Sequence, residues 1–173
     1  MRFREASLED ATSIARVTVD TWRTAYRGII DDNYLNNLSY AEREESWRQF
    51  PFNNSFIFVA EDDTRSIIGF AAAGPERTSN PVYAGELYAI YVDQGHQNQG
   101  IGSMLFRSVI KRFEESGVKS LLIWVLSDSP YRRFYERYDG HPIETKLLAM
   151  DGFPNLITSY GWLDIADSFL TER

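Results

Sequence analysis

Apolar and polar positions recur at regular intervals along the chain, and these intervals predict its helices and strands. Apolar residues in about residues 9–27 are three or four positions apart, which is the spacing of one helix face. A second helical segment covers about residues 32–49, and Ser39 is expected to interrupt it. The alternating segment "MRFREA" comes before both, so the first third is predicted to be a strand followed by helices.

The rest of the chain is predicted to be mostly strands. The runs "FIFVAED" and "SIIGFAAAG" surround the polar "DDTR", which indicates an antiparallel hairpin. After a loop at residues 76–85, the run "ELYAIYV" predicts a central strand, and a helix follows from about residue 100 to residue 116. The run "KSLLIWVL" predicts a strand buried on both faces, and "DSPYRRFYERY" a short helix with Pro130 in its first turn. Two last strands, "IETKLLAM" and "LITSYGWL", surround the turn "DGFPN".

This order of elements predicts an α/β fold with a mixed sheet and helices around it. The chain has 173 residues, of which 43% are hydrophobic, so it is long enough for one well-packed core and too short for two. We therefore expect a single domain over residues 1–173. No apolar run approaches the roughly 18 residues that a transmembrane helix requires.

Composition and charge narrow the classes of function. With no cysteine, the chain has no disulfide, no thiolate metal site and no cysteine nucleophile. The start "MRFREASLED" has no apolar signal core, so a cytoplasmic protein is expected. A net charge of −7 argues against a general nucleic-acid binder and weakly favours cationic partners such as amines. Solubility alone explains the charge equally well.

The segment "QNQGIGS", residues 97–103, lies where the central strand gives way to an amphipathic helix. The first N–H groups of a helix have no intrahelical partner, and the helix dipole adds about half a positive charge there. The segment is therefore a candidate cradle for a pyrophosphate, although a tight turn without a ligand fits these residues equally well. A Walker loop would need lysine after Gly102, where Ser103 stands, and a dinucleotide fingerprint would need a small residue in place of Leu105.

The same segment resembles the acetyl-CoA signature of the GNAT family of N-acetyltransferases, Q/R-x-x-G-x-G/A, with Gln97, Gly100 and Gly102 at its fixed positions. The stretch "SPYRRFYERYDGHPI" resembles a later motif of the family, and "SYGWLD" is similar to the last strand of many small bacterial members. The order of elements resembles the GNAT fold over nearly the whole chain. The resemblance implies a mixed, mostly antiparallel central sheet that is splayed at the cofactor site and flanked by helices.

The resemblance also implies acetyl-CoA as cosubstrate, with no metal. Backbone N–H groups of the signature would hold the pyrophosphate, and main-chain groups of the preceding strand would hold the pantetheine arm. Asp128 and Tyr131 depart from the family pattern, which commonly has asparagine and a small residue there; both are expected to contact the cofactor and to affect its affinity. The signature residues are Gln97, Asn98, Gln99, Gly100, Ile101, Gly102 and Ser103, and the strand residues are Ile90, Tyr91 and Val92.

Acetyl transfer to an amine requires a neutral amine and a proton for the departing thiolate. By resemblance, Tyr135 is the acid that protonates the sulfur, and Glu86 is the general base, directly or through water. Tyr135 could instead be a packing residue of an amphipathic helix. Glu86 could be a carboxylate that only orients the substrate or water.

The resemblance implies direct attack on acetyl-CoA by a primary amine, and a small molecule is the expected acceptor. Aromatic side chains beside carboxylates suit a cation, and the candidates for the acceptor pocket are Trp22, Tyr26, Tyr83 and Tyr160. A protein N-terminus or lysine remains an alternative acceptor, and a non-catalytic acyl-CoA-binding or regulatory module remains an alternative function. The presence of both Glu86 and Tyr135 favours the enzyme. Dimers are common in the family, so a homodimer is expected by analogy.

Overall fold

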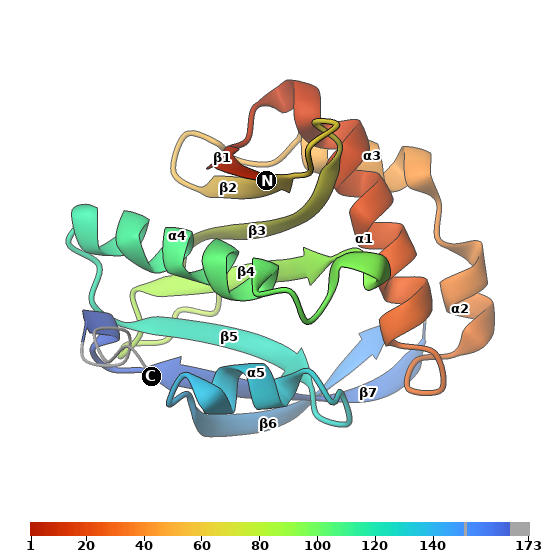
Figure 1. The fold of residues 1–173 in the computed structure, drawn as a ribbon. Helices are drawn as coiled ribbons and strands as arrows, with labels where there is room; N and C mark the ends of the chain where they lie inside the picture. The colour runs from red at the N-terminus through yellow and green to blue at the C-terminus, as the bar shows by residue number, and fades with distance from the viewer. Residues whose placement is uncertain (151, 167–173) are drawn as a thin grey trace. The chain divides into compact units, whose positions relative to one another are not determined.

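The structure, a computed structural model, describes residues 1–150 and 152–166 and has a mixed, mostly antiparallel sheet flanked by helices (Figure 1). Seven strands are hydrogen-bonded in the order β1-β2-β3-β4-β5-β7-β6, and the β4–β5 pair is parallel. This confirms the predicted α/β class. The strands are β1 (Arg2–Glu5), β2 (Phe56–Glu61), β3 (Ile67–Pro75), β4 (Gly85–Val92), β5 (Leu121–Leu126), β6 (His141–Met150) and β7 (Phe153–Trp162). The helices are α1 (Ala11–Ala25), α2 (Asp32–Asn37), α3 (Tyr40–Arg48), α4 (Ile101–Glu115) and α5 (Arg132–Arg137), with short 3-10 turns η1 (Leu8–Asp10) and η2 (Gln94–His96).

Contacts within the chain define two compact units. The first unit consists of Met1–Ala73 and Ala89–Val109, and the second of Gly74–Tyr88 and Ile110–Arg173. Strand β4 and helix α4 each contribute residues to both units. In the part of the chain that the structure describes, no helix is long and apolar enough to cross a membrane.

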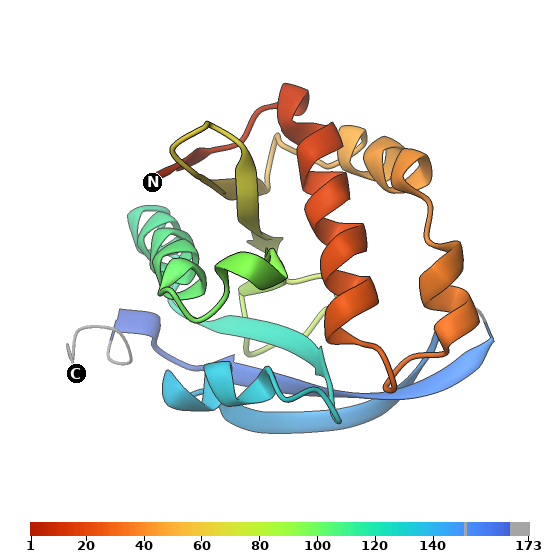
Figure 2. The ribbon, with the colours of Figure 1, turned by 45° about the vertical axis from the view of Figure 1, so that its right-hand side comes forward.

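In the first unit, helices pack beside the β1–β3 strands. Helix α1 lies alongside α3 (Figure 2), and the indole N–H of Trp47 on α3 donates to the Thr18 hydroxyl on α1 at 3.2 Å. The Trp47 ring also meets the ring of Phe70 on β3 edge-on, with centroids 5.2 Å apart. The apolar spacing that predicted α1 is its buried face, which includes Ile14 and Val17.

The predicted break at Ser39 is confirmed, since α2 and α3 are separate helices. Ser39 is the N-cap of α3, and its hydroxyl accepts from the backbone N–H of Glu42 at 3.3 Å. Serine is favoured there because it satisfies an N–H that the first helical turn leaves without a partner.

In the second unit, α5 packs on β7. The Tyr135 ring lies 6.3 Å from that of Tyr160 and 6.5 Å from that of Trp162, and the Trp162 indole donates to the Tyr138 carbonyl at 2.6 Å. The helix begins at Arg132, later than predicted, so Pro130 does not lie in its first turn. The reason is that a turn with hydrogen bonds between residues three apart precedes the helix. In this turn the N–H of Arg132 donates to the Ser129 carbonyl at 3.3 Å.

Candidate active site

The signature segment in the first unit reverses the chain between η2 and α4. Asn98 has φ 59° and Gly100 has φ 80°, both in the left-handed region. Glycine adopts this region without steric penalty, and asparagine tolerates it better than most residues. The fixed glycine of the motif at position 100 is therefore required by backbone conformation.

Helix α4 opens with donors that the helix does not use. Its first intrahelical hydrogen bond runs from the Met104 N–H to the Gly100 carbonyl at 3.0 Å. The N–H groups of Ile101, Gly102 and Ser103 precede that bond, so they have no acceptor within the helix. Buried Leu105 fixes the helix in the core of its unit. A 15-residue helix that begins in this way can hold an anion at its N-terminus.

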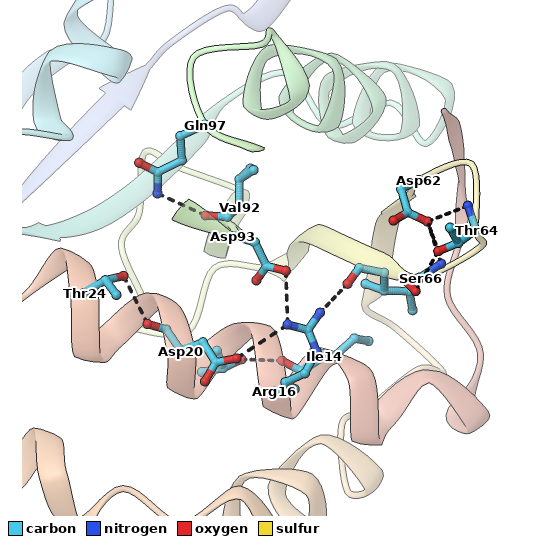
Figure 3. A network of polar contacts seen from close by, with 12 residues as sticks. Ile14, Arg16, Asp20, Thr24, Asp62, Thr64, Ser66, Val92, Asp93 and Gln97 are labelled. Atoms are coloured by element: carbon cyan, nitrogen blue, oxygen red, sulfur yellow. Dashed lines mark hydrogen bonds and ion pairs between the residues drawn. The ribbon is translucent and has the colours of Figure 1, made fainter. Parts of the chain in front are cut away.

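The side chain of Gln97 ties the signature to the end of β4. Its amide nitrogen donates to the Val92 carbonyl at 3.0 Å (Figure 3). The first fixed position of the motif thus positions the main chain of the turn. Ile90, Tyr91 and Val92, the strand residues predicted to face the pantetheine arm, are all half-buried on the last part of β4.

Asp93, the residue after β4, is anchored by Arg16 of α1 (Figure 3). The guanidinium lies 3.1 Å from an Asp93 carboxylate oxygen and donates to the Ile67 carbonyl at 2.5 Å. Burial raises the pKa of Asp93, and the Arg16 charge acts in the opposite direction. The Asp93 N–H also donates to the Ile68 carbonyl at 2.8 Å. The strand end therefore has a fixed position relative to α1 and β3, and the signature turn begins from it.

Close packing supports the same strand end from β3. A Cβ atom at Gly69 would lie 3.0 Å from the Tyr91 carbonyl oxygen and 3.2 Å from a Val92 methyl group. The Tyr91 ring packs edge-on against Phe70 with centroids 5.7 Å apart, and burial raises the pKa of its phenol. The Tyr91 side chain is thus part of the packing of the first unit.

In the second unit, Glu86 is 2% exposed and forms an ion pair with Arg77. One carboxylate oxygen accepts from Arg77 Nη2 at 2.6 Å, and the other accepts from Arg77 Nε at 3.2 Å and from the Arg77 backbone N–H at 3.0 Å. Burial lowers the pKa of Arg77, but hydrogen bonding and the charge of Glu86 outweigh it and raise the pKa overall. The two side chains therefore hold each other in place.

The contact of Arg77 with Glu86 is not predicted by the sequence, because Arg77 lies in the segment 76–85, which the sequence pattern predicts only as a loop. Its guanidinium lies over the Tyr88 ring, 3.9 Å from the centroid. The Tyr88 hydroxyl in turn donates to the Pro75 carbonyl at 2.6 Å. No pattern in a single sequence indicates this contact; covariation of positions 77 and 86 among relatives could have done so.

Tyr135, the predicted acid, is 5% exposed on α5. It lies among the rings of Phe134, Tyr160 and Trp162. Asp128 and Tyr131 are exposed in the turn before the helix. These surroundings suit a packing residue and also a hydroxyl that is held in a fixed direction.

The four candidates for the acceptor pocket fall into two pairs. Trp22 and Tyr26 are in contact in the first unit, with ring centroids 5.2 Å apart. In the second unit, Tyr83 packs against Gly161, and the Tyr160 hydroxyl donates to Glu136 at 3.0 Å. Burial raises the pKa of both Tyr83 and Tyr160, and the Glu136 carboxylate adds to the effect at Tyr160. Within residues 1–150 and 152–166, no group of acidic, histidine or cysteine side chains is arranged to hold a metal ion.

The chain is similar to known acetyltransferases. The family model "Acetyltransferase (GNAT) family" matches residues 22–140. The uncharacterized N-acetyltransferase YuaI of Bacillus subtilis is 37% identical over 163 residues, which cover 94% of this chain and 93% of YuaI. PaiA N-acetyltransferase of Thermoplasma acidophilum, solved with coenzyme A, is 18% identical with a TM-score of 0.67, covering 93% of this chain and 98% of that one. YncA of Salmonella typhimurium, solved with acetyl-CoA, is 19% identical with a TM-score of 0.70, covering 95% of this chain and 94% of that one. The chain belongs to the GNAT family and is an N-acetyltransferase.

Proposed function

We propose that this enzyme transfers the acetyl group of acetyl-CoA to the primary amine of a small molecule, by direct attack in a ternary complex. The observation that carries the proposal is the main-chain cradle at residues 97–103, where three N–H groups precede the first helical hydrogen bond of α4. Acetyl-CoA would supply the activated acetyl group, and coenzyme A would leave as a thiolate that needs a proton. Its pyrophosphate suits the positive end of the helix dipole.

Main-chain groups do most of the binding in this proposal. The N–H groups from Gln97 to Ser103 hold the pyrophosphate, and the main chain of residues 90–92 holds the pantetheine arm. Asp128 and Tyr131 contact the cofactor from the turn before α5, where both are exposed. The left-handed backbone at Gly100 and the Gln97–Val92 hydrogen bond support this assignment.

Two side chains move protons. The Tyr135 hydroxyl donates to the departing sulfur. Glu86 accepts the proton of the amine through a water molecule at Oε1, because among the described residues Oε1 accepts only from Arg77 Nη2, whereas Oε2 already accepts two hydrogen bonds from Arg77. The acceptor contacts the ring of Tyr83, which packs over Gly161 on the side of the sheet that carries Glu86, and an aromatic ring suits an amine that arrives as a cation.

The domain organisation, the oligomeric state and the location are also proposed, each from a separate observation. Residues 1–173 act as one acetyltransferase domain, since β4 and α4 run through both compact units and the family match spans residues 22–140. A homodimer is proposed because β6, the last strand in the sheet order, is exposed along most of its length, with Leu147 68% exposed. A cytoplasmic location is proposed from the absence of cysteine.

Thermal unfolding with acetyl-CoA, CoA, ATP and NAD in parallel tests the proposal. A ligand at about 100 times its dissociation constant stabilises by roughly 2.7 kcal/mol, which raises the Tm of a domain of this size by several degrees. We expect shifts with acetyl-CoA and CoA and none with NAD, followed by CoA release with a panel of primary amines. No shift at millimolar CoA would refute the cradle. A shift without CoA release from any amine or lysine peptide would identify a non-catalytic binding module instead.

A further inference from the structure

One face of the sheet in the second unit carries Glu86 together with other charged and aromatic side chains. Glu86 on β4 pairs with Leu122 on β5, so their side chains point to the same side. Tyr88 and Trp124, two residues further along these strands, share that face. Trp124 pairs with Ser159 on β7, which pairs with Glu144 on β6. We call this surface, with Lys146 two residues after Glu144, the Glu86 face.

Two cations on the Glu86 face are held over aromatic rings. The Arg77 guanidinium lies 3.9 Å from the centroid of Tyr88, and the Lys146 ammonium lies 3.8 Å from that of Trp124. Such stacking fixes a long cationic side chain that would otherwise be mobile. Of the three lysines in the sequence, Lys146 alone is half-buried, whereas Lys111 and Lys119 are exposed. The positive charges are therefore placed and held on this surface.

Hydrogen-bond donors remain on the same face. The Trp124 indole N–H is buried without a partner among the described residues, which is uncommon for a buried donor. Glu86 accepts hydrogen bonds from Nε and Nη2 of Arg77. The Nη1 group of Arg77 has no hydrogen-bond partner in residues 1–150 and 152–166. The Glu86 charge is neutralised by this pair, and the other carboxylate on the face, Glu144, is exposed and can turn to solvent. The remaining donors are complementary to an anion.

We infer that the Glu86 face binds a carboxylate of the acceptor, so that the acceptor is an amine that also carries a carboxylate. Lys146 supplies the net positive charge, and the open edge of Arg77 and the Trp124 N–H supply directed donors. The open edge of a guanidinium matches the two oxygens of a carboxylate. Arg77 is bonded directly to Glu86, so the group that receives the amine proton and the group that binds the anion are neighbours. This fits an amino acid, in which few bonds separate the amine from the carboxylate. The inference rests on the proposed function.

Matched acceptors test the inference. CoA release is measured at saturating acetyl-CoA with free amino acids, the corresponding amino-acid amides, and the amines that lack the carboxyl group. We expect kcat/KM for the acids to exceed that for the amides at least about tenfold, mainly through KM. Lys146→Gln and Arg77→Lys should reduce the acid-to-amide ratio several-fold through KM and leave the acetyl-CoA thermal shift unchanged. Lys111→Gln, at an exposed lysine on α4, is the matched control and should retain the ratio.

Four results would overturn the inference. Amides that react as well as acids with the unaltered enzyme would show that no carboxylate is bound. Variants that slow acids and amides equally would reduce Arg77 and Lys146 to a structural role. A preference for phosphoethanolamine over the amino acids would replace carboxylate by phosphate. If no acceptor reacts, the free acids must still raise the Tm of the CoA complex, and the absence of that rise also refutes the inference. Absence of any shift with acetyl-CoA would instead refute the proposed function.

Discussion

The signature segment and the Glu86 face use the polypeptide in different ways. Residues 97–103 present main-chain N–H groups, and their geometry depends on backbone dihedrals at Asn98 and Gly100. The Glu86 face presents side chains, and their positions depend on ion pairing and stacking between residues from different strands and loops. A site made of backbone tolerates most side-chain changes but not changes of conformation, whereas a site made of side chains responds to single atoms. The two regions should therefore fail differently, the first in acetyl-CoA binding and the second in acceptor binding, seen as a change in KM.

Tyr135→Phe should have the largest effect and should separate rate from binding. Loss of a positioned acid lowers kcat by about 10²- to 10⁴-fold, while the acetyl-CoA thermal shift stays within about 1 °C. Steady-state CoA release and thermal unfolding measure the two quantities. Tyr138→Phe, on the half-buried tyrosine that follows the same helix, is the control and should keep its rate. Unchanged turnover of Tyr135→Phe across a broad pH range would exclude the acid role.

Arg16→Ala tests the support of the signature from α1. Removing the cation leaves the partly buried Asp93 carboxylate uncompensated, and we expect a loss of about 2 kcal/mol of stability at pH 7. The effect depends on pH, because burial already raises the pKa of Asp93 and loss of Arg16 raises it further. An acid with a raised folded-state pKa destabilises the fold above that pKa, so the difference between variant and parent should shrink as the pH falls towards the unfolded pKa.

Urea unfolding between pH 4 and pH 7 measures this difference. Asp93→Asn is the control background, in which the pH dependence of the Arg16→Ala effect should disappear. A destabilisation that is the same at every pH would mean that the bond from Arg16 to the Ile67 carbonyl, and not the charge of Asp93, carries the effect.

Gly100→Ala tests the backbone directly. No heavy atom outside the chain neighbours lies within 4 Å of the added Cβ, so the expected loss of about 1 kcal/mol comes from the left-handed φ of 80° alone. Relaxation of that angle would turn the N–H groups of the cradle, and we expect acetyl-CoA to bind about tenfold more weakly. An added Cβ at Gly95 also has no heavy atom within 4 Å, and Gly95 lacks a positive φ. Gly95→Ala should therefore leave stability and acetyl-CoA affinity nearly unchanged. Equal effects at the two positions would contradict the conformational explanation.

Tyr91→Phe should have the smallest effect. The side chain packs against Phe70, whereas the proposed contact with the pantetheine arm is made by the main chain. Loss of the hydroxyl should lower stability by at most about 1 kcal/mol and leave acetyl-CoA affinity within about twofold. Calorimetric titration measures the affinity. A tenfold weakening would show that the hydroxyl belongs to the binding site.

Local features of this fold could be predicted from the sequence, and features that depend on strand order could not. The break at Ser39 and the glycine at position 100 follow from capping and from φ, which are properties of a few neighbouring residues. The start of α5 was placed too early because Pro130 suits both a first helical turn and the turn that precedes it. The Arg77–Glu86 pair requires the loop after β3 to fold back on β4, and the Lys146–Trp124 contact requires β7 to lie between β5 and β6. No periodicity in the sequence encodes either arrangement.

The contact between Tyr83 and Gly161 has a consequence for how such a sequence can change over generations. A Cβ atom at position 161 would lie 2.5 Å from the Tyr83 ring, so even alanine there would require the tyrosine ring to move. Substitution of Tyr83 by a smaller residue would open the position, and the two changes would then be accepted in one order only. Lineages that have kept the tyrosine should also have kept the glycine, and the pair should be inherited as a unit.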